Sequence, residues 1–443
     1  MSSRYLELRP TNSTNDDKYA FKHGVAQINF TIPEGNYVLD PTSVRIVGDI
    51  RYYKNESGDA PVGTEALTSS ARLGVWACFQ QLIWRSSKHQ TTLSHERNWN
   101  RWLSSYLSLS SGTTDDALSH FSESALTLPN YEAHKRSVVA GATTSSFCVH
   151  LPCSLLNSNQ SIPLTGNTLG GLDLSIMMES DAMALQVLPA DFSTDPAVAG
   201  FEGAYYEFSN IKLVCSVITP PPDQLSRLLS QSEGSMTLQS VHSYYDTANS
   251  QNLQMSMNFA LNKVKSLYVN FLPSNKLNNL ANDSFATIDP MNTDGSIANI
   301  LKLSILRSGT LFPKLFPRDT NIKENPDTIN ADPILFKDYV NSVVAFDKAT
   351  HIQGSTANAN RNYVGKATGK GIPYQLVGDG GVVSGIGVNF DNFLGGSGVD
   401  LNAVPFGLAI ESDLTSNNSQ SLFIYVNAET TILFNQTGIQ VLQ

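Results

Sequence analysis

The sequence predicts an all-β protein built from two halves of similar size. Apolar and polar residues alternate through much of the chain, which is the two-residue period of strands with one buried face. Three consecutive prolines, Pro220–Pro222, interrupt this pattern near the middle of the 443 residues. Domains usually hold about 100–200 residues, so a chain of this length favours two or three of them. We therefore expect two β domains in tandem, with the boundary at the prolines.

The composition indicates a folded chain that does not condense nucleic acid. Hydrophobic residues make up 41% of the sequence and charged residues 15%, which suits large cores under a polar surface. The 29 Lys and Arg residues are outnumbered by 39 Asp and Glu residues, for a net charge of -10. Nucleic-acid binders gather positive charge, and residues 1–25 contain no polybasic arm. We expect no direct sequence-specific nucleic-acid binding.

The first residues lack the basic and apolar pattern of a secretory signal, and no stretch approaches the ~18 apolar residues of a membrane span. We therefore expect synthesis in the cytosol without a signal peptide. Four cysteines are too few for a disulfide scaffold and are expected as reduced, packed thiols. They are Cys78, Cys148, Cys153 and Cys215.

Strands are predicted in both halves from the alternating pattern. In the first half they cover residues 25–32, 43–53, 76–84, 147–151, 169–178 and 211–218. In the second half they cover residues 236–245, 252–261, 266–272, 300–306, 406–411, 422–428, 430–435 and 439–442. Between the halves, Leu225, Leu228 and Leu229 have helical spacing behind Asp223 as a plausible N-cap, which predicts a short linker helix.

Three regions depart from the strand pattern and are predicted to be elaborated connections. Residues 95–107 have Trp99, Trp102 and Tyr106 at helical spacing, which predicts a helix on the outside of the first barrel. Residues 108–146 are rich in Ser and Thr. Residues 318–403 are rich in Asn and Asp and then in Gly, and a segment of that length usually has a functional or interfacial role.

Candidate chemical motifs are weak, and we predict no catalytic, cofactor-binding or metal-binding residues. Cys148, His150 and Cys153 have zinc-like spacing but lack a fourth ligand, so a strand with a polar face is the preferred interpretation. GGSGVDLN (395–402) matches one calcium-binding nonapeptide, a site that requires stacked copies. VGKATGKG (364–371) fails the spacing of a phosphate loop. His95-Glu96 starts a zinc-protease pattern that Trp99 breaks.

Four tryptophans lie within 27 residues, and two interpretations of them differ in function. An exposed group of Trp76, Trp84, Trp99 and Trp102 would make a platform for stacking sugars. Their placement on a strand and a neighbouring helical face favours packing of that helix against the barrel.

The order of several passages resembles the double jelly-roll major capsid proteins of the adenovirus and tectivirus lineage. The resemblance is closest to those of polinton-like viruses, adintoviruses and virophages. It is found in YVLDPTSVRIVGDIRYY, in WACFQQLIWRSSKHQTTLSHERNWNRWLSSYL, in IPLTGNTLGGLDLSIMM and in YYEFSNIKLVCSVITPP. These passages cover much of residues 25–220, and the second half is similar in architecture more than in motif.

This resemblance implies a domain plan for the chain. Residues 1–20 are an N-terminal arm and residues 21–218 a first jelly roll with the 108–146 insertion. Residues 219–234 are the proline-rich linker with its helix, and residues 235–443 a second jelly roll with the 318–403 insertion. The strands would stand roughly normal to a shell, with both insertions as candidates for the outer tower and both termini near the inner surface.

The resemblance also implies a function. The chain would be a structural protein of the virion rather than an enzyme, forming homotrimers that act as pseudo-hexameric capsomers of an icosahedral shell. Implied partners are other copies of the chain, penton and minor capsid proteins, and an internal membrane. Two other classes stay open on the residues alone: a glycan-binding β-sandwich adhesin or spike, and a β-sandwich glycosidase with two carboxylates converging in a cleft.

Overall fold

The structure is a computed structural model. It describes residues 2–12, 14, 16–59, 66–70, 73–109, 145–158, 160–188, 198–230, 233–248, 252–258, 260–285, 300–311, 318–319, 341–343, 385–390, 398–402, 405–412, 414–415, 419–435 and 437–443. Within these residues the chain is mostly β, with the strands of each half paired among themselves, as the sequence predicts.

Two sheets come from the first half of the chain. Outer sheet 1 contains β1 (Ser2–Leu8), β2 (Lys18–Tyr19), β4 (Val38–Leu39), β5 (Arg45–Tyr53), β9 (Ser145–His150), β10 (Ile162–Pro163) and β13 (Tyr205–Thr219). Inner sheet 1 contains β3 (Gln27–Ile32), β11 (Leu172–Met178), β7 (Phe79–Ser86) and β8 (Thr92–Glu96), in that spatial order. A separate pair joins β6 (Ala66–Ser69) to β12 (Leu185–Leu188). All these pairings are antiparallel, which short connections allow.

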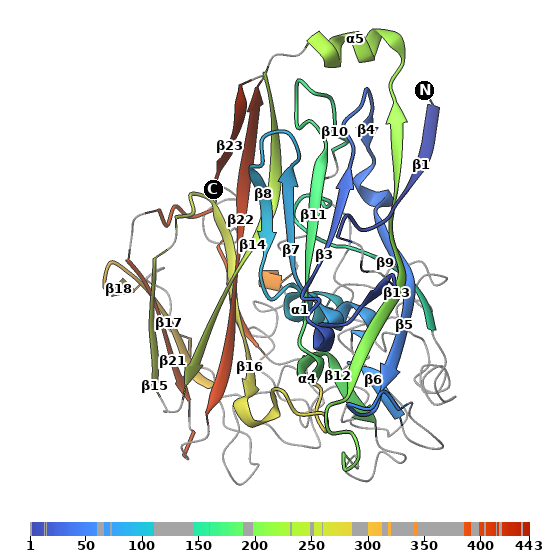
Figure 1. The fold of residues 1–443 in the computed structure, drawn as a ribbon. Coiled ribbons are helices and arrows are strands. Elements are labelled where there is room, and N and C mark those ends of the chain that lie inside the picture. Colours follow the sequence, from blue (N-terminus) through green and yellow to red (C-terminus); the bar gives the residue numbers. More distant parts are fainter. Residues whose placement is uncertain are drawn as a thin grey trace.

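Two further sheets come from the second half. Inner sheet 2 contains β14 (Glu233–Ala248), β22 (Gln420–Asn435), β16 (Val264–Pro273), β20 (Ile386–Asn389) and β23 (Gly438–Leu442). Outer sheet 2 contains β15 (Asn252–Asn258), β21 (Pro405–Ser412), β17 (Ile300–Arg307), β18 (Thr310–Leu311) and β19 (Arg318–Asp319). The four sheets stand side by side in the order outer 2, inner 2, inner 1, outer 1 (Figure 1). The two inner sheets therefore face each other.

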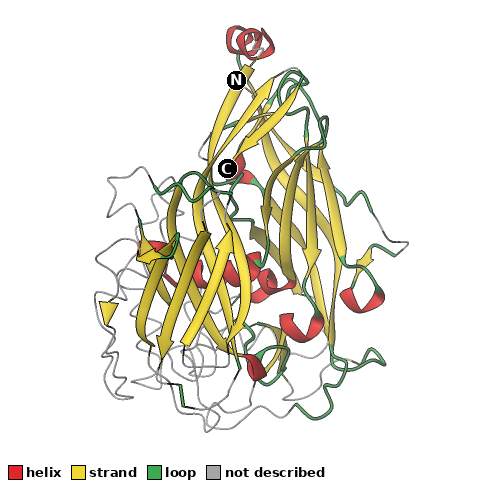
Figure 2. Cartoon of the chain, turned by 90° about the vertical axis from the view of Figure 1, so that its left-hand side faces the viewer, coloured by secondary structure: helices red, strands yellow, loops and turns green. Residues whose placement is uncertain are grey.

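The sheets are accompanied by α1 (Trp99–Leu109), α4 (Asp181–Ala184) and α5 (Pro222–Ser230), and residues 341–343 are also helical. Short 3-10 turns cover Phe21–His23, Pro41–Ser43, Gly74–Cys78 and Ser274–Lys276. Helix α5 stands beyond the ends of the strands, near the N-terminus (Figure 2). None of the helices in the described ranges is long and apolar enough to span a membrane.

Three local predictions are wrong, and one strand was not predicted. Strand β1 pairs with β13 from Ser2, within the segment expected as the N-terminal arm. Trp76 lies in a 3-10 turn before β7 rather than in a strand. The strands expected at 422–428 and 430–435 are one continuous strand, β22. Helix α5 begins at Pro222, so Asp223 lies in its first turn and is not the N-cap.

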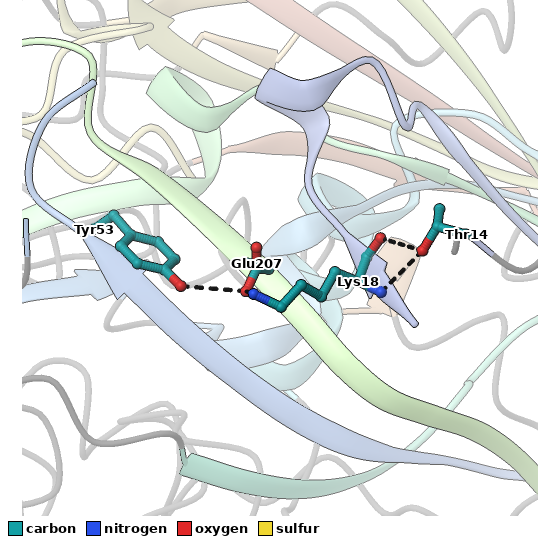
Figure 3. Close-up of polar contacts among 4 residues, drawn as sticks. All are labelled: Thr14, Lys18, Tyr53 and Glu207. Atoms are coloured by element: carbon teal, nitrogen blue, oxygen red, sulfur yellow. Dashed lines mark hydrogen bonds and ion pairs between the residues drawn. The ribbon is translucent and has the colours of Figure 1, made fainter. Parts of the chain in front are cut away.

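The N-terminal segment is fixed to outer sheet 1 by a small polar cluster at its surface. The Thr14 hydroxyl accepts a hydrogen bond from the Lys18 amide at 2.9 Å and donates one to the Lys18 carbonyl at 2.7 Å. The Lys18 ammonium lies 3.2 Å from a carboxylate oxygen of Glu207, which also accepts from the Tyr53 hydroxyl (Figure 3). This carboxylate raises the pKa of Lys18 through its hydrogen bond and its charge.

Candidate interface between the two barrels

Helix α1 is buried on every side between the two pairs of sheets. Trp99, Trp102, Leu103 and Tyr106 pack in the first half, where the Trp99 indole donates to the Pro152 carbonyl at 2.6 Å. The polar residues between them are also buried: Asn100, Arg101, Ser104 and Ser105. The predicted helix is therefore confirmed, and the second half of the chain covers the face that it turns away from the first barrel.

The polar face of α1 contacts the second half of the chain directly. The Ser104 hydroxyl donates to the Phe285 carbonyl at 2.9 Å, and the Asn270 side-chain amide donates to the Ser105 hydroxyl. The Arg101 guanidinium donates to the Ser284 carbonyl. Backbone carbonyls and amides far apart in the sequence thus satisfy polar groups that would otherwise cost free energy in a dry interface.

Arg101 is the central residue of this contact. Its guanidinium carbon lies 3.8 Å from the centre of the Phe423 ring and 5.4 Å from that of Phe285. Only 2% of the residue is exposed. A desolvated cation between aromatic faces contributes about 2 kcal/mol. Burial lowers the pKa of Arg101 to about 10, so the group stays charged at neutral pH.

A buried carboxyl lies on the first-half side of this cation. Glu179 accepts from the Asn100 side-chain amide at 3.1 Å and from the Ser180 amide at 2.9 Å. Burial raises the pKa of Glu179, and the hydrogen bonds oppose that rise. Asn100 also donates to the Ala77 carbonyl at 3.0 Å, so one side chain ties α1 to two neighbouring segments.

The centre of inner sheet 2, formed by β16 and the first half of β22, is buried on both of its faces. Along β22, Leu422, Ile424 and Val426 pack in the core between the two sheets of the second half. Phe423 and Tyr425, which alternate with them, pack in a cluster that includes the core of the first half. Every residue of β16 is buried as well. The two barrels therefore share one continuous apolar contact rather than a solvated linker.

The tryptophans settle one of the sequence alternatives. Trp76, Trp84, Trp99 and Trp102 are at most 2% exposed, so they form no platform for sugars, and the packing interpretation is confirmed. The interface itself is harder to predict from the sequence. Arg101 and Asn100 belong to a helix that also has an apolar face, and polar residues in such an amphipathic pattern usually face water.

The proposed motif residues do not assemble into a reactive centre. Cys148 and His150 lie on the half-buried face of β9 while Phe147 and Val149 point to the core, as expected. Cys153 is buried, and burial raises its pKa well above the usual value. In the described part of the chain, no group of three or more His, Cys, Asp or Glu side chains is arranged to hold a metal ion.

The other motifs are placed as follows. His95 and Glu96 belong to strand β8 instead of a helix, and Glu96 accepts from the Ser154 amide at 2.9 Å. Val399, in the nonapeptide-like segment, forms an antiparallel bridge with Val264. Residues 364–371 lie outside the described residues, as does most of both long insertions.

The comparisons with known proteins agree with this geometry. No protein-family model matches the sequence, and no curated protein matches it. VP54 of PBCV-1, in a crystal structure fitted into a reconstruction of the virophage Sputnik, is similar with a TM-score of 0.58 at 11% identity. The similarity covers 100% of this chain and 96% of that one.

Two further solved structures are similar along nearly the whole chain. The Faustovirus major capsid protein has a TM-score of 0.55 at 10% identity, covering 98% of this chain and 90% of its own. A chain of the Sputnik virophage structure has a TM-score of 0.52 at 13% identity, covering 100% and 88%. At these identities the likeness concerns the fold. The chain has the double jelly-roll fold that the sequence predicts.

Proposed function

We propose that this chain is a viral major capsid protein whose homotrimers form pseudo-hexameric capsomers of an icosahedral shell. The observation that supports this most is the extent of the structural likeness. It runs through both barrels and covers 98% of the chain against a protein described as a major capsid protein. A match to one barrel alone would suit many unrelated sandwich proteins.

The interface between the barrels fits this role. Because α1, Arg101 and inner sheet 2 bury a continuous contact, each chain acts as one block with two barrels. Three such blocks around a three-fold axis present six similar barrels, which pack on a hexagonal lattice with one gene product. Two barrels joined by a flexible connection would not keep a fixed hexagonal outline.

Under this proposal the domain plan is the one expected from the sequence. Residues 1–20 are the arm, 21–218 the first jelly roll, 219–234 the linker and 235–443 the second jelly roll. The insertions 108–146 and 318–403 build the outer tower. The end with α5 and the N-terminus faces the inside of the shell.

The proposal includes a place and partners. The protein is made in the cytosol and resides in the virion, contacting further copies of itself, penton and minor capsid proteins, and an internal membrane where the virus has one. It acts by shape, without catalysis or a cofactor. The net charge of -10 supports the absence of direct sequence-specific nucleic-acid binding.

The first experiment is the mass of the purified chain in solution, by light scattering, followed by negative-stain imaging of the same sample. We expect three times the 48.2 kDa of one chain and a pseudo-hexagonal outline, or closed shells. A strict monomer at high protein concentration would overturn the proposal. The adhesin and glycosidase classes would then be tested by sugar binding and by hydrolysis of oligosaccharides.

A further inference from the structure

Two strand edges meet where the two barrels face each other. Strand β8 ends inner sheet 1 and, among the described residues, pairs only with β7. Strand β14 ends inner sheet 2 and in the same ranges pairs only with β22. Figure 1 shows β8 beside β14, and the Ser243 hydroxyl donates to the Arg97 carbonyl at 2.7 Å between them. Each strand therefore has one edge without a strand partner among the described residues, and both strands border the same gap.

The gap is a real cleft. Its volume is about 440 Å³, within the range of about 300–1,000 Å³ in which ligand sites usually fall. Its walls are β8 on one side and β14 on the other, with the end of the described chain at Gln443 beside them. The cleft thus belongs to both barrels at once.

The walls of the cleft are rich in hydroxyl groups. Seven of the lining residues have hydroxyl groups: Thr92, Ser94, Ser154, Ser240, Ser243, Tyr244 and Thr430. Arg97 is exposed and supplies a permanent positive charge. No Asp or Glu side chain is among the described residues that line the cleft, and the buried Glu96 behind the wall accepts from the Ser94 hydroxyl and the Ser154 amide.

The remaining polar groups of β14 are already arranged. The Ser240 hydroxyl lies 3.0 Å from the His242 ring nitrogen and 2.8 Å from the Thr430 hydroxyl. The His95 ring nitrogen lies 3.1 Å from the Gln81 side-chain oxygen. The strand edges and the exposed Arg97 guanidinium together suit an extended polypeptide, because its backbone continues a ladder and a carboxylate pairs with arginine.

We propose that this cleft docks an extended peptide segment of a partner protein, which pairs with the open edge of β8 or β14 and presents a carboxylate to Arg97. The hydroxyl-rich walls alone would also suit a sugar. The two strand edges favour a polypeptide, since a sugar cannot continue a ladder. The inference goes beyond the proposed function. A single chain already contains the whole cleft, so peptide binding does not require the trimer.

The probe is a synthetic array of labelled heptapeptides with a central Glu and flanking positions filled by Ser, Thr or Val. Matched arrays carry a central Lys, or proline at two flanking positions. Binding to the purified full chain is measured by fluorescence anisotropy up to millimolar peptide. We expect saturable binding for members of the Glu array only, because lysine repels Arg97 and proline cannot complete a ladder.

Variants and hydrogen exchange locate the binding. Arg97→Ala should weaken the best Glu peptide about tenfold, the worth of one charge-assisted contact. Arg227→Ala, on α5 and equally exposed, is the matched control and should bind as the unchanged protein does. Amide exchange should slow in β8 or β14 on binding. Thermal unfolding checks that both variants are folded.

Three results would overturn the inference. One is the absence of saturable binding across the whole Glu array. Another is equal binding of the Glu, Lys and proline arrays, or an affinity that Arg97→Ala does not change. The third is binding of neutral oligosaccharides with protection of the same strands, which would assign the cleft to sugars. A monomeric chain that binds these peptides would overturn the capsomer proposal and leave this one standing.

Discussion

The interface between the barrels and the outer face of outer sheet 1 hold charge in opposite ways. Arg101 is 2% exposed, lies between two phenyl rings and, within the described residues, forms no ion pair. Lys18 lies 3.2 Å from a Glu207 oxygen, but 51% of its side chain is exposed. The residue without a salt bridge is the one that joins the two halves of the molecule.

This difference follows from hydration. Water still stabilises the Lys18 ammonium, although only 11% of the Glu207 side chain is exposed, so we expect their pairing to add less free energy than the contacts of a fully buried charge. Arg101 has lost its water, so the rings of Phe285 and Phe423 and the Ser284 carbonyl must replace it. A buried charge therefore tolerates few arrangements of the groups around it. We expect Arg101 in this way to fix the orientation of one barrel relative to the other. The comparison leads to four measurements, from the largest expected effect to the smallest.

Replacing Arg101 should cost the most. Arg101→Ala removes the cation between two rings and leaves a hole in the interface. We expect the free energy of unfolding, measured in urea, to fall by about 3–5 kcal/mol. Arg101→Met retains most of the volume and should lose less than half as much. A loss below about 1 kcal/mol for the alanine variant would show that Arg101 does not hold the barrels together.

Acid should weaken the interface. Burial lowers the pKa of His242 on β14 to about 4, below the value of about 6.5 in an unfolded chain. The unfolded state then binds more protons between these values, so stability is lost as the pH falls from about 6.5 to 4. The contribution of His242 is about 3 kcal/mol.

The test is urea unfolding at a series of pH values for the unchanged chain and for His242→Gln, which keeps a polar partner for Ser240. The variant should show a shallower loss toward pH 4. Identical slopes would contradict the assignment. The pKa of Lys18 is raised, so its contribution is lost only as the pH rises above about 10.

Two amide-to-carboxylate hydrogen bonds offer a matched pair. The Asn100 amide donates to buried Glu179 at 3.1 Å, and the exposed Asn55 amide donates to Asp59 at 2.8 Å. Asn100→Ala should destabilise the chain by about 2 kcal/mol, because Glu179 and the Ala77 carbonyl lose a donor in a buried site. Asn55→Ala should cost about 0.5 kcal/mol or less. Equal losses in thermal unfolding would contradict the proposed difference.

The surface pair should give the smallest effect. Lys18→Ala and Glu207→Ala, combined in a double-mutant cycle, should show a coupling of less than about 1 kcal/mol. Higher salt should reduce it further, since the Lys18 side of the pair is open to solvent. A coupling above about 2 kcal/mol would mean that the pair on the outer face contributes as much free energy as the contacts of the interface. The contrast between the two regions would then be wrong.

Alternation in the sequence was enough to predict most of the strands, because each barrel buries one face of a sheet. The three consecutive prolines marked the boundary between the halves, since proline lacks the backbone N–H that a β-ladder needs. Continuity was harder to predict. Glu429 lies between the two strands expected within residues 422–435, and a charged residue at that place indicates a turn. In the structure it forms an ion pair with Lys263 and belongs to one long strand, β22.

The interface itself could not be predicted from local pattern. Arg101 has the spacing of a solvent-facing residue on an amphipathic helix, and its partners Ser284 and Phe423 lie far along the chain. Only the folded arrangement of two barrels brings them together. Strand β1 was missed for a related reason: SSRYLEL alternates weakly, and its residues pair with β13 through the backbone, which leaves little mark on side-chain composition.

The double burial of inner sheet 2 also has a consequence for synthesis. Strand β22 follows β14, β16 and β20 along the chain, and it pairs with both β14 and β16. While the ribosome is still making the second half, α1 and the facing side of inner sheet 1 have nothing to cover them. The nascent first barrel therefore exposes the polar face of α1, with Arg101, Ser104 and Ser105, until its partners in the second half emerge, and that interval is when a chaperone has most to protect.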